Sequence, residues 1–94
     1  MVLVGVCSIR LMIQESGSLK EKRHTLKSII ERLKSRFNVS VAETGLNDKW
    51  QSAEIGVAFV SNDRVHIEKT INNVIDFVDN DYRVEVTDYS IDMY

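Results

Sequence analysis

The sequence predicts an α+β fold in which a four-stranded antiparallel sheet carries two helices on one face. Apolar residues recur at helical spacing in two stretches and alternate with other residues in four stretches. These stretches follow the order strand, helix, strand, strand, helix, strand, with turn residues between them. A length of 94 residues with 44% hydrophobic and 28% charged residues is ordinary for a globular protein. We therefore expect one domain over residues 1–94.

The first strand and the first helix have the clearest signals. Residues 2–13 are apolar on both faces at their start, which is typical of a central strand. A helix is predicted over residues 18–37, because Ser18 and Glu21 have the spacing of a capping box. The helix carries an apolar stripe that should face the sheet, formed by Leu19, Leu26, Ile29, Ile30, Leu33 and Phe37.

The middle of the chain reads as a β-hairpin. A short strand is predicted over residues 39–44, and residues 45–49 (GLNDK) carry turn chemistry. Trp50 follows this turn, and we expect it to pack against the edge of the core. Residues 53–60 alternate strictly, which indicates a strand with one buried face.

The last two elements are a helix over residues 64–79 and a strand over residues 82–93. Three residues could cap this second helix, and the sequence does not choose among them: Ser61, Asn62 and Asp63. In the last strand the alternation changes phase, so we expect a β-bulge near Thr87 and Asp88.

The element order βαββαβ is that of the ferredoxin-like fold, whose two right-handed crossovers place the first and third strands in the centre. If the helices cover one face of the sheet, the other face presents a continuous apolar patch. Such a patch on a small domain usually marks an interface, and we expect it to support a homodimer. The predicted interface consists of Val2, Val4, Val6, Gly56, Ala58 and Val60.

Charge is distributed very unevenly along the chain. The net charge of −2 argues against a general nucleic-acid binder. Residues 18–37, however, contain seven basic and two acidic residues, whereas residues 76–94 contain one basic and six acidic residues. Cations near a helix N-terminus oppose the helix dipole, so a partner would explain them better than stability does. The predicted phosphate-binding residues are Lys20, Lys22, Arg23, Lys27 and Lys34, the alternative being a solvated face whose side-chain stems cover the core edge.

Five segments together carry a family resemblance. They are LKEKR at residues 19–23, LKS at 26–28, FNVSVAE at 37–43, WQ at 50–51 and IGVA at 55–58. This run resembles the YlxP-like family of small bacterial proteins of unknown function. The resemblance implies a ferredoxin-like fold, a cytoplasmic protein and no established enzyme activity. It also implies an RNA or ribosome association, because members are often encoded among translation and ribosome-maturation factors.

Catalytic and other binding chemistries find little support. The segment from Gly56 to Val60 is similar to the third strand of the RNA-recognition motif, but Ile55 and Val57 replace its basic and aromatic residues. An acylphosphatase-like site needs an arginine in the loop after the first strand, and residues 14–17 (QESG) contain none.

We expect no metal or cofactor either. His24 and His66, combined with Glu43 or Asp48, lack a metal-ligand spacing. The single cysteine, Cys7, lies in an apolar run and should be a buried thiol. That run is too short to span a bilayer and follows no basic segment, so we expect neither signal peptide nor membrane anchor.

The sequence thus predicts a non-enzymatic, cytoplasmic domain that associates with RNA or the ribosome through its first helix. The alternative is a homo-oligomerisation module that uses the open face of its sheet.

Overall fold

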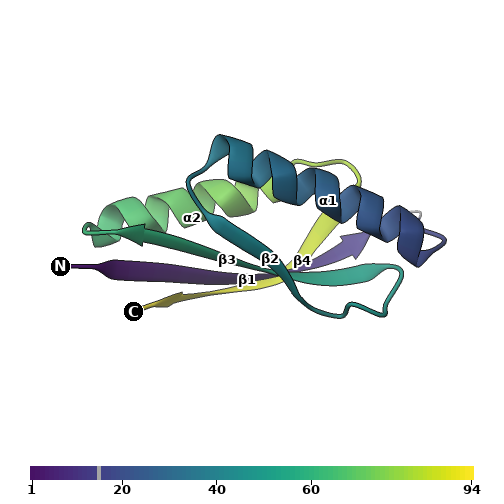
Figure 1. Cartoon of the computed structure of the whole chain (residues 1–94), viewed down its shortest axis with the longest axis horizontal. Coiled ribbons are helices and arrows are strands. Elements are labelled where there is room, and N and C mark those ends of the chain that lie inside the picture. The colour runs from purple at the N-terminus through teal and green to yellow at the C-terminus, as the bar shows by residue number, and fades with distance from the viewer. Residues whose placement is uncertain (15) are drawn as a thin grey trace.

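The computed structural model describes residues 1–14 and 16–94 and confirms the predicted ferredoxin-like architecture. Four antiparallel strands form one sheet in the order β2-β3-β1-β4, so the first and third strands are central, as expected. Both helices lie on the same face of this sheet (Figure 1). The elements are β1 (Leu3–Ile13), α1 (Leu19–Arg36), β2 (Ser40–Gly45), β3 (Ser52–Ser61), α2 (Arg64–Asp79) and β4 (Val84–Met93). Glu15, in the predicted turn before α1, lies outside the described residues.

The core fills the space between the sheet and the two helices. The helix-facing sides of β1 and β3 are buried, and with them five residues of α2: Ile67, Ile71, Val74, Ile75 and Val78. In α1 the stripe is narrower than predicted, because Leu19, Ile30 and Phe37 are only partly covered. Gly5 lets α2 approach β1 closely, since a Cβ atom there would collide with the side chains of Ile67 and Ile71.

Both helix starts are capped by the residue types that the sequence indicated. The Oγ atom of Ser18 accepts a hydrogen bond from the Glu21 N–H at 3.2 Å, and the Glu21 carboxylate accepts one from the Gly17 N–H at 2.7 Å. Asp63 caps α2, because its carboxylate accepts hydrogen bonds from the N–H groups of Val65 and His66. The structure therefore chooses Asp63 among the three candidates.

The predicted bulge in β4 is confirmed at Thr87. Arg10 of β1 pairs with Asp88, whereas the next residue, Leu11, pairs with Val86, so Thr87 is the extra residue. Its hydroxyl donates a hydrogen bond to the carbonyl oxygen of Arg10 at 3.3 Å.

The expectation for Trp50 is wrong, because its side chain is 55% exposed. The neighbouring residue Gln51 holds this part of the loop instead. Its carbonyl oxygen accepts a hydrogen bond from the Ile13 N–H at 2.8 Å, and its side chain donates one to the Ser16 carbonyl oxygen at 3.4 Å. The loop thereby extends the pairing of β3 with β1 and leaves the indole ring in solvent.

Cys7 is fully buried, as predicted, and burial raises the pKa of its thiol to about 11. A thiol with so high a pKa stays protonated at neutral pH and is a poor nucleophile.

Phe59 is also buried under the helices, where its ring meets the His66 ring edge-on at 5.4 Å. The open face of β3 therefore presents no phenylalanine for base stacking.

Neither α1 nor α2 is long and apolar enough to cross a bilayer.

Candidate functional site

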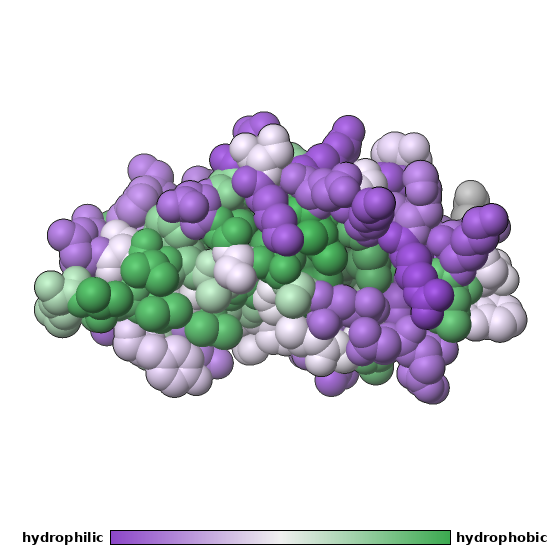
Figure 2. Space-filling model, viewed as in Figure 1, coloured by the Kyte–Doolittle hydropathy of each residue, from purple (hydrophilic) through white to green (hydrophobic). Residues whose placement is uncertain are grey.

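Six exposed cations follow one another along α1, and this row is spread over both sides of the helix. Hydrophilic side chains gather along the upper surface in Figure 2, over the helices. None of these six cations forms an ion pair with another residue of the described chain. Both acidic residues of α1 are exposed as well. The Glu21 carboxylate accepts the hydrogen bond from the Gly17 N–H at the helix start, and Glu31 lies beside the cations. The exposed cations are Lys20, Arg23, Lys27, Arg32, Lys34 and Arg36.

Three of the predicted phosphate-binding residues lie together on the side of α1 that faces β2. Arg23, Lys27 and Lys34 line a shallow hollow of about 360 Å³. Ile30 lies in the same hollow and is half-buried, so the cationic side chains both cover apolar surface and keep their charges in water. Lys20 is exposed as predicted, but it lines a different hollow at the start of α1.

Lys22 is not part of this surface, although the sequence suggested it. Its side chain is 1% exposed, and its Nζ atom donates a hydrogen bond to the Leu46 carbonyl oxygen at 2.6 Å. The same atom lies 3.3 Å from a carboxylate oxygen of Glu43. Lys22 precedes the buried Leu26 by four residues, so it points down the core side of the helix and ties α1 to the β2–β3 loop. It cannot reach a phosphate in solvent.

The backbone of the β2–β3 loop is shaped for this contact. Leu46 has a φ of 59°, a left-handed conformation that non-glycine residues rarely adopt. Its carbonyl oxygen accepts the Lys22 hydrogen bond, so the buried ammonium holds the loop in this geometry.

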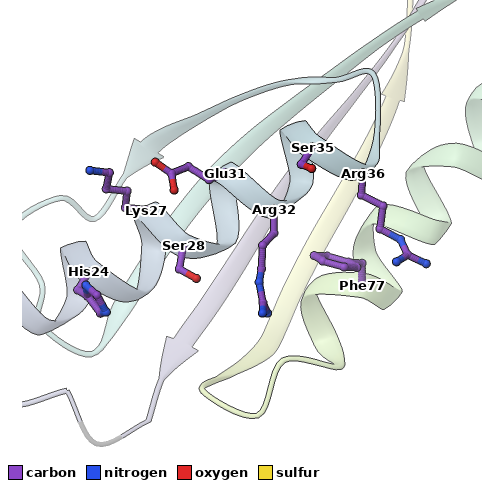
Figure 3. A pocket seen from close by; sticks show the side chains of 8 residues that line it. All are labelled: His24, Lys27, Ser28, Glu31, Arg32, Ser35, Arg36 and Phe77. Carbon is purple, nitrogen blue, oxygen red and sulfur yellow. The ribbon is translucent and has the colours of Figure 1, made fainter.

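A second, larger groove runs between α1 and α2, and sequence reasoning missed it. Figure 3 shows Arg32 and Arg36 reaching from α1 toward α2, where the ring of Phe77 lies close to Arg36. The Cζ atom of Arg36 lies 5.3 Å from the centre of the Phe77 ring, within the range of a cation–π contact. Phe37 meets Phe77 edge-on at 5.9 Å and supports it from the side. The groove has a volume of about 820 Å³ and is lined by His24, Lys27, Ser28, Glu31, Arg32, Ser35, Arg36 and Phe77.

Acidic residues lie at the end of this groove beside Phe77. Asp81, the most buried of them, already forms an ion pair with Arg83. The Arg83 guanidinium donates hydrogen bonds to both carboxylate oxygens of Asp81, at 3.0 and 2.7 Å, and another to the Ser28 hydroxyl at 3.1 Å. The hydrogen bonds from Arg83 hold the pKa of Asp81 below its usual 3.8, and the charge of Arg32 acts in the same direction. Arg83 therefore offsets much of the negative charge next to Arg32 and Arg36.

The described residues hold no group of three or more histidine, cysteine or acidic side chains that could bind a metal ion. His24 lies in the interhelical groove, and His66 packs against Phe59 near the start of α2. The structure does not bring the two histidines into one such group.

Comparison with known proteins places the chain in a family. Residues 4–91 match the family described as "Protein of unknown function (DUF503)". The chain belongs to this family. It is 41% identical over 85 residues to the uncharacterized protein YlxP of Bacillus subtilis (strain 168), an alignment that covers 90% of this chain and 92% of that protein. The resemblance seen in the sequence is thereby confirmed.

Two solved structures share the fold. The de novo designed protein Foldit4 superposes with a TM-score of 0.60 at 18% identity, covering 100% of this chain and 97% of the designed one. The de novo designed protein Ferredog-Diesel gives a TM-score of 0.57 at 15% identity, covering 95% and 83%. At these identities the likeness concerns the fold alone. The DUF503 fold is thus one that designed sequences also adopt, and the function has to be argued from the side chains.

Proposed function

We propose that this protein is a non-enzymatic domain that associates with RNA, free or within the ribosome, through the exposed cations of α1. The observation that carries the proposal is the row of six exposed cations without ion-pair partners among the described residues, on a chain whose net charge is −2. Positive charge is concentrated on one helix although the chain as a whole is acidic.

The length of the row favours a polyanion over a small anion. From Lys20 to Arg36 the helix rises by about 24 Å, at about 1.5 Å per residue. One phosphate or carboxylate would contact one or two of these side chains. A nucleic-acid strand carries a phosphate about every 3.4 Å along a duplex axis and offers charge along the whole row.

Folding stability does not account for the cations at the start of α1. Lys20 and Arg23 lie in the first turns of α1, at the positive end of the helix dipole, where a cation costs about 0.3–1 kcal/mol. Contact with phosphates would recover that cost and release counterions from the RNA.

A charge-matched pair of variants tests the proposal. The double variant Arg23→Gln/Lys27→Gln removes two charges from the proposed site, and Arg64→Gln/Lys69→Gln removes two from α2. Arg64 pairs with Glu68 on the surface, a contact of little energetic weight, so both variants should fold. Binding is measured by fluorescence anisotropy with a labelled oligoribonucleotide and by co-sedimentation with ribosomes, over a range of salt concentrations.

We expect the α1 variant to flatten the slope of log K against log salt by roughly 1.5 units, at about 0.7–0.9 per lost phosphate contact. The α2 variant should keep the wild-type slope. An unchanged slope in the α1 variant, or an equal loss in both, would refute the proposal.

A second candidate function rests on the open face of the sheet. Val2 and Val60 are 76% and 60% exposed, and Val60 pairs with Val4, two residues after Val2. Both chain termini lie at one end of the molecule (Figure 1). Tyr94 is 73% exposed and exchanges two backbone hydrogen bonds with Val4, so it extends the same apolar area. Hydrophobic residues gather at this end in Figure 2.

The remaining interface positions are less open than the sequence suggested. Val6, Gly56 and Ala58 are half-buried, and the methyl group of Thr44 lies over Gly56. A homodimer would therefore use the terminal end of the face. The variant Val4→Asp, compared with wild type by light scattering, tests this, because a charge there would oppose a dimer and be solvated in a monomer. A dimer should persist or strengthen at high salt, whereas phosphate binding should weaken steeply. A wild-type protein that is monomeric at micromolar concentration would end this second candidate.

A further inference from the structure

We infer that the RNA is single-stranded where it meets the groove between α1 and α2, and that one unpaired base stacks there on Arg36. This inference rests on the proposed function and names the form of nucleic acid that the site selects.

The stacking platform is the pair formed by Arg36 and Phe77. The guanidinium lies over the Phe77 ring at 5.3 Å from its centre and is also within 6.0 Å of the Phe37 ring centre. The Phe37 and Phe77 rings meet edge-on, so Phe37 supports Phe77 from the side. Arg36 is exposed, so a planar ligand can reach its guanidinium from solvent. Guanidinium planes and aromatic rings are the surfaces on which proteins stack unpaired bases.

The rest of the groove suits the backbone of the same strand. Arg32 lies one turn before Arg36, and His24 continues the lining toward the start of α1 on the same side of the helix, as Figure 3 shows. Lys27 lies at the rim of the groove, and its side chain points away from Arg32. From His24 to Arg36 the helix rises by about 18 Å. A strand whose base occupies the Arg36 end would therefore place its following phosphates beside Arg32 and, at the rim, Lys27.

The residues that line the groove beyond Phe77 favour a base over an acidic peptide as the ligand. Asn73, Asp76 and Asn80 line the adjoining hollow together with Arg32 and Arg36. Asp76 would repel an acidic peptide side chain. The amide and carboxylate groups can instead exchange hydrogen bonds with the edge of a base, which carries both donors and acceptors.

A duplex cannot use this platform, because the faces of its bases are covered by their neighbours in the stack. It could meet the cations of α1, but with its phosphates alone. The structure therefore predicts a preference for unpaired RNA that depends on the shape of the Arg36 side chain and not on its charge.

The test is the variant Arg36→Lys, which keeps the positive charge and removes the planar guanidinium. The matched control is Arg64→Lys, the same exchange at the start of α2, outside the proposed site. Each protein is titrated with a 12-nucleotide single-stranded oligoribonucleotide and with the corresponding duplex, and folding is checked by circular dichroism.

We expect Arg36→Lys to weaken single-strand binding about tenfold, since stacking of one base typically contributes that much or more. Duplex binding, the salt slope and the Arg64→Lys control should stay close to wild type. A second variant, Phe77→Leu, should weaken single-strand binding in the same direction by removing the ring beneath the guanidinium.

Failure of the stacking inference and failure of the proposed function give different results. Salt-dependent RNA binding that Arg36→Lys leaves unchanged, or an equal loss with duplex or with Arg64→Lys, would overturn the stacked base and leave phosphate binding by α1 standing. An absence of salt-dependent RNA binding in the wild-type protein would overturn both.

Discussion

Replacement of Lys22 by methionine should destabilise the protein strongly while leaving the proposed phosphate-binding surface intact. Methionine is of similar length, so the main loss is the buried ammonium group. The Glu43 carboxylate then loses its counter-ion at 3.3 Å, and the Leu46 carbonyl oxygen loses its donor at 2.6 Å. Removing one partner of a buried ion pair costs about 3–5 kcal/mol. Because the Glu43 side chain is 24% exposed, we expect the lower end, about 3 kcal/mol.

Thermal and urea unfolding, followed by circular dichroism, measure this loss. For a domain of this size about 3 kcal/mol corresponds to a fall in Tm of roughly 12–24 °C. The double variant Lys22→Met/Glu43→Leu removes the stranded carboxylate and leaves the Leu46 carbonyl unpaired. Its cost should therefore fall to about 1–2 kcal/mol. With the single variant Glu43→Leu measured as well, the cost of the double variant minus the costs of the two single variants gives the coupling between the two side chains.

The same variant separates the structural role of Lys22 from a binding role. Below its Tm, Lys22→Met should bind RNA with the wild-type salt slope. A variant as stable as wild type, or a folded variant with a flattened slope, would refute our reasoning and return Lys22 to the phosphate-binding site.

Two further predictions concern Trp50 and Asp81. Trp50→Ala should lower the free energy of unfolding by less than about 1 kcal/mol, because the indole is 55% exposed; a loss near 3 kcal/mol in urea unfolding would contradict its placement. Arg83 holds the pKa of Asp81 below its usual 3.8. The charged form of Asp81 therefore stabilises the fold above that pH, and this stabilisation is lost as the pH falls through the lowered folded-state pKa. The stability difference between wild type and Asp81→Asn should thus be full at pH 6 and shrink below pH 4. A difference that is constant with pH would show that the Arg83 contact does not depend on the charge of the Asp81 carboxylate.

The sequence predicted the fold well, because local chemistry determines where its elements begin and bend. The short hydroxyl side chain of Ser18 bonds a nearby N–H, so the start of α1 could be read from spacing alone. The bulge at Thr87 was visible because one extra residue shifts the alternation of every later residue in β4. These signals depend on neighbours in the chain and need no knowledge of tertiary packing.

The candidate site was only partly predictable, and Lys22 shows why. Helical spacing placed Arg23, Lys27 and Lys34 on one side of α1, and the structure keeps them there. Lys22 is next to Arg23 in the sequence, but one residue turns a helix by about 100°, which moves its side chain onto the core stripe. The spacing from Lys22 to Leu26 contained this information, but lysine is so seldom buried that its residue type outweighed its position. Its acceptor, the Leu46 carbonyl oxygen, lies 24 positions along the chain and becomes a partner only after the hairpin has formed.

The interhelical groove depends on how α1 and α2 lie against each other. The same arrangement gives a further argument about the form of RNA that the proposed site would bind. Arg36 and Phe77 are far apart in the sequence, and they meet because both helices pack on one face of the sheet. The cations of α1 consequently divide between its two sides, and Lys27 lines the hollow on each. A duplex is stiff over far more than the length of this helix, so it would contact the cations of one side at a time. A flexible single strand that crosses α1 at Lys27 can place phosphates beside Arg23 on one side and a base on Arg36 on the other. The division of charge about Lys27 therefore favours the same unpaired RNA as the stacking platform does.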